Sequence, residues 1–320
     1  MVCAVLDVAD DAFDVLAGAA VLAVFAEFFF HVQYTSFYVC RICQSSSAAM
    51  QPPLRRDSFI LPGLPDYYSR QRRRSVIMSL FTIADLHLPG ADGKSKSMEV
   101  FGRRWADYRA RLERGWRAAV APDDSVVIPG DISWALTLDE ARSDLAFIDS
   151  LPGQKYIGKG NHDFWWATAA KMKAFFLANN FTTLNILYNN AYLAGGAVIC
   201  GSRGWFFDEA SQKTVGDVSW EKLVNREEMR LRMSLEEGTR LSAGMGADMP
   251  MIAFLHFPPV WGDSVARNII DLLHEFGIRR CYFGHIHSEY VSQQPFCFED
   301  IEFRLISADH LAFCPIRVFI

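Results

Sequence analysis

The sequence lacks an apolar segment long enough to place it securely in a membrane. Its most apolar run, residues 15–30, is short for a membrane span and contains Glu27. Acidic residues precede this run, at the place where a secretory signal carries positive charge. We therefore expect no secretory signal, disfavour membrane association and predict a cytoplasmic protein.

A disulfide framework is also missing. The chain has 7 cysteines, an odd number, and they are scattered without regular spacing. Cys40 and Cys43 have the spacing of half a zinc knuckle or of a redox pair, but no second pair follows them. This pattern favours reduced thiols in a cytosolic protein.

There is no excess of positive charge. The formal net charge is −5, which gives no reason to expect a broad nucleic-acid surface. Hydrophobic residues make up 51% of the 320 residues, enough to bury a full core. The sequence contains no evident internal repeat.

The first 77 residues differ in character from the rest of the chain. The segment from Cys43 to Arg74 is rich in Ser, Pro and Arg and has no sustained hydrophobic period. We expect residues 1–77 to be a poorly structured or weakly anchored extension, or the product of a misread start site. The organised domain should then cover residues 78–320.

Helices and short buried strands are predicted throughout that domain. A charged segment at about 218–244 has few apolar positions and predicts a helical insertion that forms a solvated arm or cap. The predicted strands are Ser79–Ala84, Ser125–Pro129, Lys155–Gly158, Met251–Leu255 and Arg280–Phe283, with further β-prone residues around Tyr188 and over Ala191–Cys200. The other predicted helices run from about Met98 to Val120, from a capping box at Thr137 and Glu140, from Trp165 to Ala178, and from Val265 to Phe276, where Gly277 closes the helix.

Five of these strands end at side chains that can bind a metal. One such strand end is ordinary, but five in succession are not, because strand ends can present several side chains to one point. Alternate residues of an extended segment also face the same side. Three glycines, Gly130, Gly160 and Gly284, would let the backbone turn just before the ligands. The side chains are Asp85 with His87, Asp131, Asn161 with His162, His256, and His285 with His287.

This ordered set resembles the motifs of the calcineurin-like metallophosphoesterase superfamily, from about Ser79 to the C-terminus. The resemblance implies an α/β fold of four layers, with a central β-sandwich flanked by helices. It also implies a site for two metal ions. By the resemblance, Asp85, His87 and His287 bind one ion, Asn161, His256 and His285 bind the other, and Asp131 bridges them. His162 would be the catalytic histidine.

The residue types are consistent with that chemistry. Two metal ions can clamp a phosphoryl group and activate a bridging hydroxide for in-line attack on phosphorus. His162 would stabilise charge or protonate the leaving oxygen, with Asp163 as its orienting partner. Oxygen and nitrogen ligands without cysteine suit manganese, iron or zinc, and the sequence does not choose among them.

The substrate is less constrained. Ser133 and Trp134 follow Gly130-Asp131, so the signature of the phosphoprotein phosphatases is absent. Trp165 could stack on a nucleobase, although core packing is favoured, and Arg203 could either meet a phosphate or lie solvated on the surface. We therefore expect hydrolysis of a small phosphodiester or phosphomonoester. A metal-binding scaffold without catalysis and a membrane-peripheral lipid phosphoesterase remain as alternatives, and the oligomeric state stays open.

Overall fold

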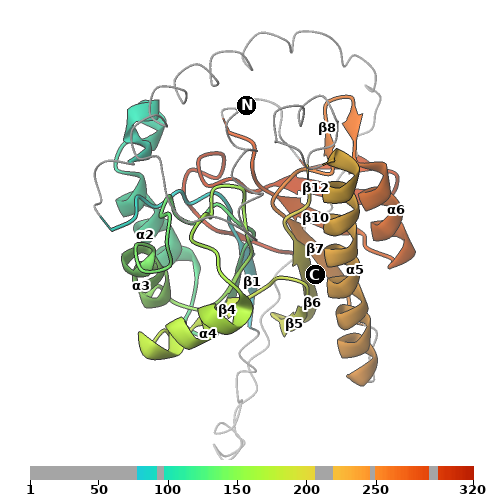
Figure 1. Cartoon of the computed structure of the whole chain (residues 1–320), viewed down its shortest axis with the longest axis horizontal. Coiled ribbons are helices and arrows are strands. Elements are labelled where there is room, and N and C mark those ends of the chain that lie inside the picture. The colour runs from blue at the N-terminus through green and yellow to red at the C-terminus, as the bar shows by residue number, and fades with distance from the viewer. Residues whose placement is uncertain (1–77, 92–96, 206–218, 246–248, 288–294) are drawn as a thin grey trace, which may run out of the picture. The chain divides into compact units, whose positions relative to one another are not determined.

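The computed structural model describes residues 78–91, 97–205, 219–245, 249–287 and 295–320. The expected N-terminal extension, with its apolar run and the Cys40 and Cys43 pair, lies outside these residues. Two β-sheets form the centre of the described domain, and helices lie on the outer side of each sheet (Figure 1). No helix of the described residues is long and apolar enough to cross a membrane.

The first sheet has five strands in the order β13-β1-β2-β3-β4. Four strands are parallel, and β13 pairs antiparallel with β1 at one edge. The bounds are β1 Leu80–Thr82, β2 Ser125–Ile128, β3 Gln154–Ile157, β4 Leu184–Ile186 and β13 Ile316–Arg317.

The second sheet has six strands in the order β11-β12-β10-β7-β6-β5. Its four central strands are parallel, and each edge strand is antiparallel to its neighbour. The bounds are β5 Ala191–Ala194, β6 Ala197–Ser202, β7 Met251–Leu255, β10 Arg280–Phe283, β11 Phe296–Phe298 and β12 Ile301–Leu305, with a separate hairpin of β8 Val260–Trp261 and β9 Ser264–Val265.

The central strands are buried on both faces, which explains why β2, β6 and β7 are mainly apolar and do not alternate with charged residues. Successive side chains alternate between two cores. In β7, Ile252 and Phe254 face the core between the sheets, whereas Ala253 and Leu255 face the core under the outer helices. The four-layer α/β arrangement predicted from the sequence is confirmed.

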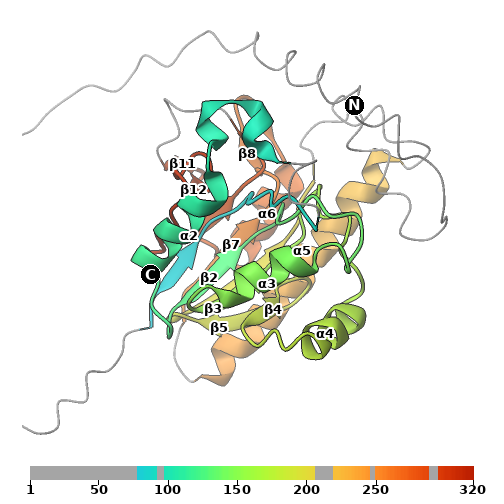
Figure 2. The same ribbon diagram turned by 90° about the vertical axis from the view of Figure 1, so that its left-hand side faces the viewer.

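The outer layers consist of helices. Figure 2 shows the helices α2 and α3 in front of the first sheet and α5 on the opposite side of the domain. The first sheet is covered by α2 Tyr108–Ala119, α3 Arg142–Ser150 and α4 Ala169–Ala178, and the second by α5 Trp220–Gly244 and α6 Arg267–Glu275.

Several predicted helices begin later than expected. The predicted helix from Met98 is two short 3-10 turns followed by α2, because Gly102 and Asp107 have positive φ angles of 107° and 52°. Thr137 accepts a hydrogen bond from the Glu140 amide, but the residues after it form turns before α3 begins. The helix expected from Trp165 begins only at Ala169, where the Thr168 side chain caps it.

The expectation that residues 218–244 form a solvated arm was wrong for the helix within them. Helix α5 packs along β5 and β6 and buries Leu223, Leu231 and Leu235. Small residues complete this face: a Cβ on Gly238 would lie only 2.5 Å from the sulfur of Cys200. Counting apolar residues underestimated the buried face, since small side chains allow a helix to approach a sheet closely.

Lys155 is a buried cation away from the ligand-bearing strand ends. Its Nζ donates hydrogen bonds to the carbonyl oxygens of Asp149, at 3.1 Å, and Leu151, at 2.5 Å, where α3 ends. Burial lowers the pKa of this amine to about 8. The side chain therefore satisfies carbonyl groups that the helix end leaves without partners.

Candidate metal centre

The predicted ligands converge where parallel strands end. The loop after β1 runs beside the loop after β2, because the Asp85 amide donates to the Gly130 carbonyl and the His87 amide to the Asp131 carbonyl. His256 directly follows β7, and His285 follows β10 by two residues. Side chains from both sheets thus reach the same edge of the sandwich.

Four of these residues adopt the left-handed backbone conformation. The φ angles are 58° for Asp85, 45° for His87, 52° for Asp131 and 70° for His285. The expectation that Asp-x-His segments are extended was therefore wrong. Such conformations cost of order 1 kcal/mol or more for residues with a side chain, and they occur preferentially at functional sites.

The glycines of the motifs allow close approach of the loops. A Cβ on Gly130 would lie 2.5 Å from the amide nitrogen of Gly160. A Cβ on Gly160 would collide with Asp131, and one on Gly284 would collide with Asp85. These glycines are therefore required by space at the centre, in addition to any turn that they make.

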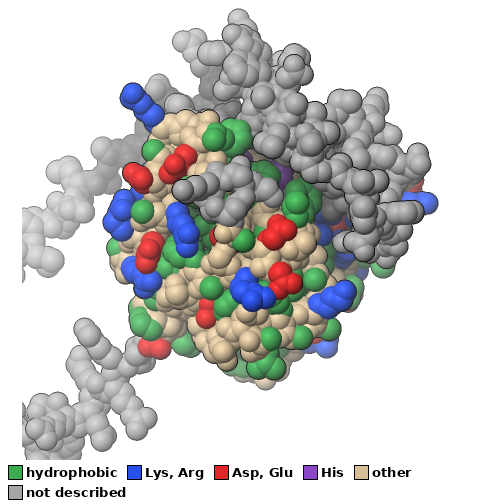
Figure 3. All heavy atoms as spheres, turned by 60° about the vertical axis from the view of Figure 1, so that its left-hand side comes forward, with side chains coloured by type: hydrophobic (Ala, Val, Ile, Leu, Met, Phe, Trp, Pro, Cys, Tyr) green, Lys and Arg blue, Asp and Glu red, His purple; other side chains and the backbone are tan. Residues whose placement is uncertain are grey.

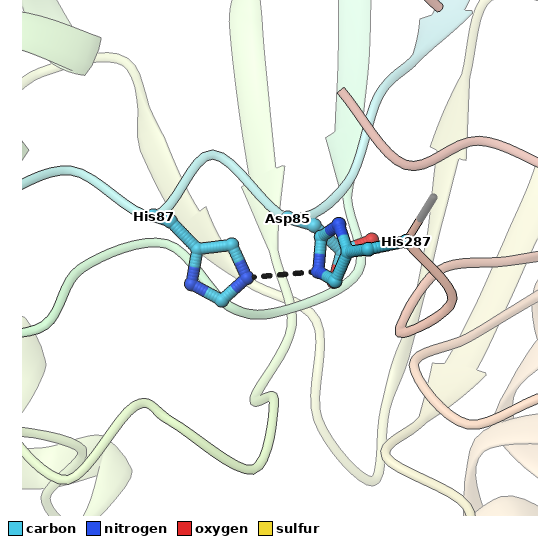
Figure 4. Close-up of side chains that lie close together, drawn as sticks. All are labelled: Asp85, His87 and His287. Atoms are coloured by element: carbon cyan, nitrogen blue, oxygen red, sulfur yellow. Dashed lines mark hydrogen bonds between the residues drawn. The ribbon is translucent and has the colours of Figure 1, made fainter. Parts of the chain in front are cut away.

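One candidate cluster consists of Asp85, His87 and His287 (Figure 4). The imidazole rings of the two histidines point toward one another, and their Nε2 atoms are 3.1 Å apart. Two nitrogens bound to one tetrahedral ion at about 2.0–2.1 Å would be separated by about 3.3 Å. The spacing therefore fits two ligands of a single ion.

A second cluster consists of Asp131, His256 and His285. Asn161, predicted as a ligand, joins it: its Oδ1 lies 2.6 Å from Nε2 of His256 and 3.0 Å from Nδ1 of His285. The second cluster thus offers oxygen and nitrogen donors without a cysteine.

Asp131 lies between the two clusters. Its Oδ1 accepts a hydrogen bond of 2.8 Å from the His162 amide, which fixes the carboxylate. Its Oδ2 is 3.6 Å from Nε2 of His87 in the first cluster and 3.5 Å from Nε2 of His256 in the second. Asp131 therefore has one oxygen close to histidines of both clusters.

The protonation energetics also fit a centre that holds cations. Burial raises the pKa of Asp85 to about 6 and raises that of Asp131 well above its usual value. Burial lowers the pKa of His87 and His256 well below the usual value, and Nδ1 of His256 is buried without a hydrogen-bond partner. Buried carboxylates and neutral imidazoles are stabilised when bound cations supply the compensating charge. The residues present thus fit a pair of metal ions.

The Asp163 carboxylate is the centre of a network of hydrogen bonds between two loops. Its carboxylate accepts hydrogen bonds from four backbone amides of the loops, Asp131, Ile132, Ser133 and Gly160, and from the indole of Trp165. These five donors use the capacity of both oxygens. Asp163 therefore ties the loop after β2 to the loop after β3, and its hydrogen bonds do not support the predicted role of orienting the His162 ring.

His162 stands beside the clusters in an aromatic environment. Its half-buried ring is 4.3 Å from Trp134 and 5.6 Å from His87, measured between ring centroids. Burial, together with the nearby His287, lowers the pKa of His162 to about 3. The imidazole is therefore neutral near pH 7 and can donate one hydrogen bond.

Sequence reasoning missed Asp309, which supports the centre from behind. Its Oδ1 accepts a hydrogen bond of 3.0 Å from Nδ1 of His287, and its backbone carbonyl accepts two from Arg104. A carboxylate behind a ligating imidazole fixes the ring and raises its basicity. The only signal in the sequence was one more acidic residue shortly after a strand, β12.

Two residues considered as substrate-binding from the sequence are buried: Trp165 packs in the core, as favoured there, and Arg203 does not lie on the surface. Trp165 is buried in the core under the outer helices, so its ring does not offer a stacking surface. Arg203 is 1% exposed and pairs with Glu227 of α5 at 3.3 Å, so the alternative of surface solvation is wrong. Among the aromatic rings that do contact the clusters, Trp134 stacks on His87 at 5.0 Å between centroids.

Taken together, the fold and the site define a two-sheet α/β domain with two adjoining candidate metal clusters. Residues 78–289 match the family model described as calcineurin-like phosphoesterase, which covers more than half of the 320 residues. The chain belongs to the calcineurin-like phosphoesterase family, as the sequence motifs indicated.

Individual relatives are distant. The gene 66 protein of Mycobacterium phage L5 is 37% identical over 84 residues, which is 25% of this chain and 37% of the phage protein. The chain thus spans little more than a third of that relative. Among solved structures, phosphopantetheinyl hydrolase from Mycobacterium tuberculosis is similar with 13% identity and a TM-score of 0.45, over 75% of this chain and 95% of that one. A protein from Thermus thermophilus has 9% identity and a TM-score of 0.46, over 75% and 98% of the two chains.

Proposed function

We propose that this protein is a dinuclear metal-dependent phosphoesterase that hydrolyses a small phosphodiester or phosphomonoester. The observation that carries the proposal is the position of Asp131, whose Oδ2 lies within 3.6 Å of a histidine of each cluster. A carboxylate that lies between two metal sites can hold two ions close together, as two-metal phosphoryl chemistry needs. Manganese, iron and zinc all suit the oxygen and nitrogen donors.

In this proposal Asp85, His87 and His287 would hold the first ion, Asn161, His256 and His285 would hold the second, and Asp131 would serve both. The chemistry that such ions would supply is the polarisation of phosphoryl oxygens and the acidification of a water molecule that attacks phosphorus. The loops that carry the ligands are fixed in advance by Asp163 and its five donors.

His162 acts on the substrate directly. Because its imidazole is neutral at pH 7, it donates an N–H hydrogen bond to the charge that develops on the phosphoryl or leaving oxygen. Trp134 and His87 pack against its ring and restrict its orientation. His162 is thus a catalytic residue in this account, and Asp163 is a positioning residue for the loops.

A reducing compartment is part of the proposal. Cys200 and Cys281 are buried free thiols, and no disulfide joins the cysteines of the described residues. This supports an enzyme that acts in the cytoplasm.

The test is hydrolysis of bis-p-nitrophenyl phosphate and p-nitrophenyl phosphate by metal-loaded protein. We expect Asp131→Asn to abolish turnover and His162→Ala to lower kcat by about 10²–10⁴-fold while the metal content stays unchanged. Circular dichroism checks that both variants fold. A wild type that holds two metal ions but is inert on a broad panel of phosphate esters would instead indicate a scaffold without catalysis.

A further inference from the structure

A buried cluster of charged residues joins α5 to the second sheet. Glu227 of α5 is fully buried, and three arginine side chains approach its Oε1. The nitrogen to Oε1 distances are 3.3 Å for Arg203, 2.5 Å for Arg230 and 3.8 Å for Arg226. We call these four residues the Glu227 cluster. Within it, three positive charges face a single carboxylate.

The three arginines are not equivalent. Arg203 is 1% exposed and completes a buried ion pair, whereas the side chains of Arg230 and Arg226 are 25% and 43% exposed. Burying charge is costly, and a buried ion pair alone rarely adds stability. Two guanidinium groups that reach solvent from one buried carboxylate form a preorganised positive site, because Glu227 holds them together against their mutual repulsion.

The Glu227 cluster adjoins the candidate metal centre on one side. The carbonyl oxygen of Arg203 accepts hydrogen bonds from the amides of His256 and Phe257. The Arg203 guanidinium lies 4.4 Å from the centroid of Trp205, and Phe257 packs against His285 at 4.4 Å. In Figure 1 the first turns of α5 lie at the end of the domain to which β7 and β10 lead.

The other side of the cluster meets the loop that carries His162. Arg230 lies over the ring of Tyr188 at 5.2 Å, and Tyr188 contacts Trp166 at 5.6 Å. Trp166 is half-buried and belongs to the segment that begins at His162. The cluster therefore connects both sheets at the edge where the metal ligands lie. Figure 3 shows blue and red side chains interspersed over the described part of the face it views.

We propose that the Glu227 cluster binds a second anionic phosphoryl group of the substrate, separate from the phosphoryl group that is cleaved. This inference rests on the proposed function. Guanidinium groups suit phosphoryl oxygens because their N–H groups form paired, charge-assisted hydrogen bonds. The preferred substrate is thus an ester with at least two phosphoryl groups, and Arg230 and Arg226 set that preference.

Matched substrates test the proposal. Each substrate is a p-nitrophenyl phosphodiester of a linear alkanediol with two to eight carbons. In one series the far end of the alkyl chain carries a hydroxyl, in the other it carries a phosphate, and kcat/KM is compared between the two series at each chain length. We expect the phosphate to raise kcat/KM about tenfold or more at one or more chain lengths, mainly through a lower KM. Arg230→Gln should abolish this preference. Arg240→Gln removes the same charge from an arginine that is 74% exposed on the same helix, and it should retain the preference.

The outcomes separate the two proposals. If the hydroxyl substrates are cleaved but the phosphate brings no preference at any length, the subsite is refuted and the phosphoesterase function stands. If neither series is cleaved, the proposed function fails, and calorimetry then decides the subsite. Alkanediol bisphosphates must bind the metal-loaded protein more tightly than the monophosphates, and Arg230→Gln must remove the difference. Equal binding of both would overturn the inference.

Discussion

Asp309 accepts a hydrogen bond from His287 and is expected to affect metal binding through that histidine, without contacting the ion itself. Asp309 is 2% exposed, and its Oδ1 receives the Nδ1 proton of His287 at 3.0 Å. Burial lowers the pKa of His287, but the hydrogen bond to Asp309 and the charges of Asp85 and Asp309 raise it overall above its usual value. In Asp309→Asn the amide oxygen can still accept this hydrogen bond, while the negative charge is lost.

The expected magnitude follows from the role of such carboxylates. Loss of a hydrogen-bonded partner behind a metal-binding histidine costs about 10–100-fold in metal affinity, or about 1.4–2.7 kcal/mol. Only the first cluster contains His287, so the protein should bind one of the two ions more weakly and the other with unchanged affinity. The substitution preserves side-chain size, and the two hydrogen bonds from Arg104 to the backbone carbonyl should persist.

Competitive titration with a metal chelator measures both affinities. Asp271→Asn is the matched control, since the Asp271 side chain is 65% exposed on α6 and pairs with Arg267 at the surface. We expect the affinity of one ion to fall relative to the other in Asp309→Asn, and both affinities to remain unchanged in Asp271→Asn. A folded Asp309→Asn protein with wild-type affinity at both sites would refute the reasoning.

Two further predictions concern packing and pH. Gly284→Ala should displace Asp85, weaken metal binding and cost about 1–3 kcal/mol of stability in thermal unfolding. Gly244→Ala is the control, because a Cβ there meets nothing within 4 Å, and it should be neutral or stabilising. Equal effects of the two substitutions would contradict this prediction. Because the pKa of Lys155 is lowered on folding, the unfolded chain binds more protons than the folded chain between about pH 8 and 10.5. The free energy of unfolding of the wild type should therefore rise by about 2–3 kcal/mol, relative to that of Lys155→Met, when the pH is raised from about 7 to 10. Urea unfolding measures both proteins at both pH values. The same stability difference between wild type and Lys155→Met at the two pH values would rule out a buried amine with a lowered pKa.

Much of the site was predictable because its ligands follow strands that the sequence displays clearly. The strands Met251–Leu255 and Arg280–Phe283 have the predicted bounds. His256 follows the first strand directly, and His285 follows the second by two residues. Parallel strands bring their carboxyl ends to one edge of a sheet, so chain order alone suggested a common site. The backbone at Asp85 and Asp131 was not predictable, because left-handed residues at strand ends have no pattern of their own apart from nearby glycines.

The errors arose where long-range contacts decide the outcome. Asp163 was assigned to His162 because the residues are adjacent, yet its carboxylate binds amides that lie 30 to 32 residues earlier in the chain. Helix α5 was judged too polar to be buried, but its polar residues Glu227 and Ser234 have partners within the domain. Neither set of partners can be inferred from local sequence.

Two metal ions held close together by Asp131 are the centre of the proposed function. Metal analysis combined with electron paramagnetic resonance of the manganese-loaded protein tests this without reference to any substrate. We predict two ions per chain and the signal of an exchange-coupled pair, as expected for ions about 3.5–4 Å apart, with coupling lost in Asp131→Asn. A single ion per chain, or two that are magnetically independent in the wild type, would contradict the central claim.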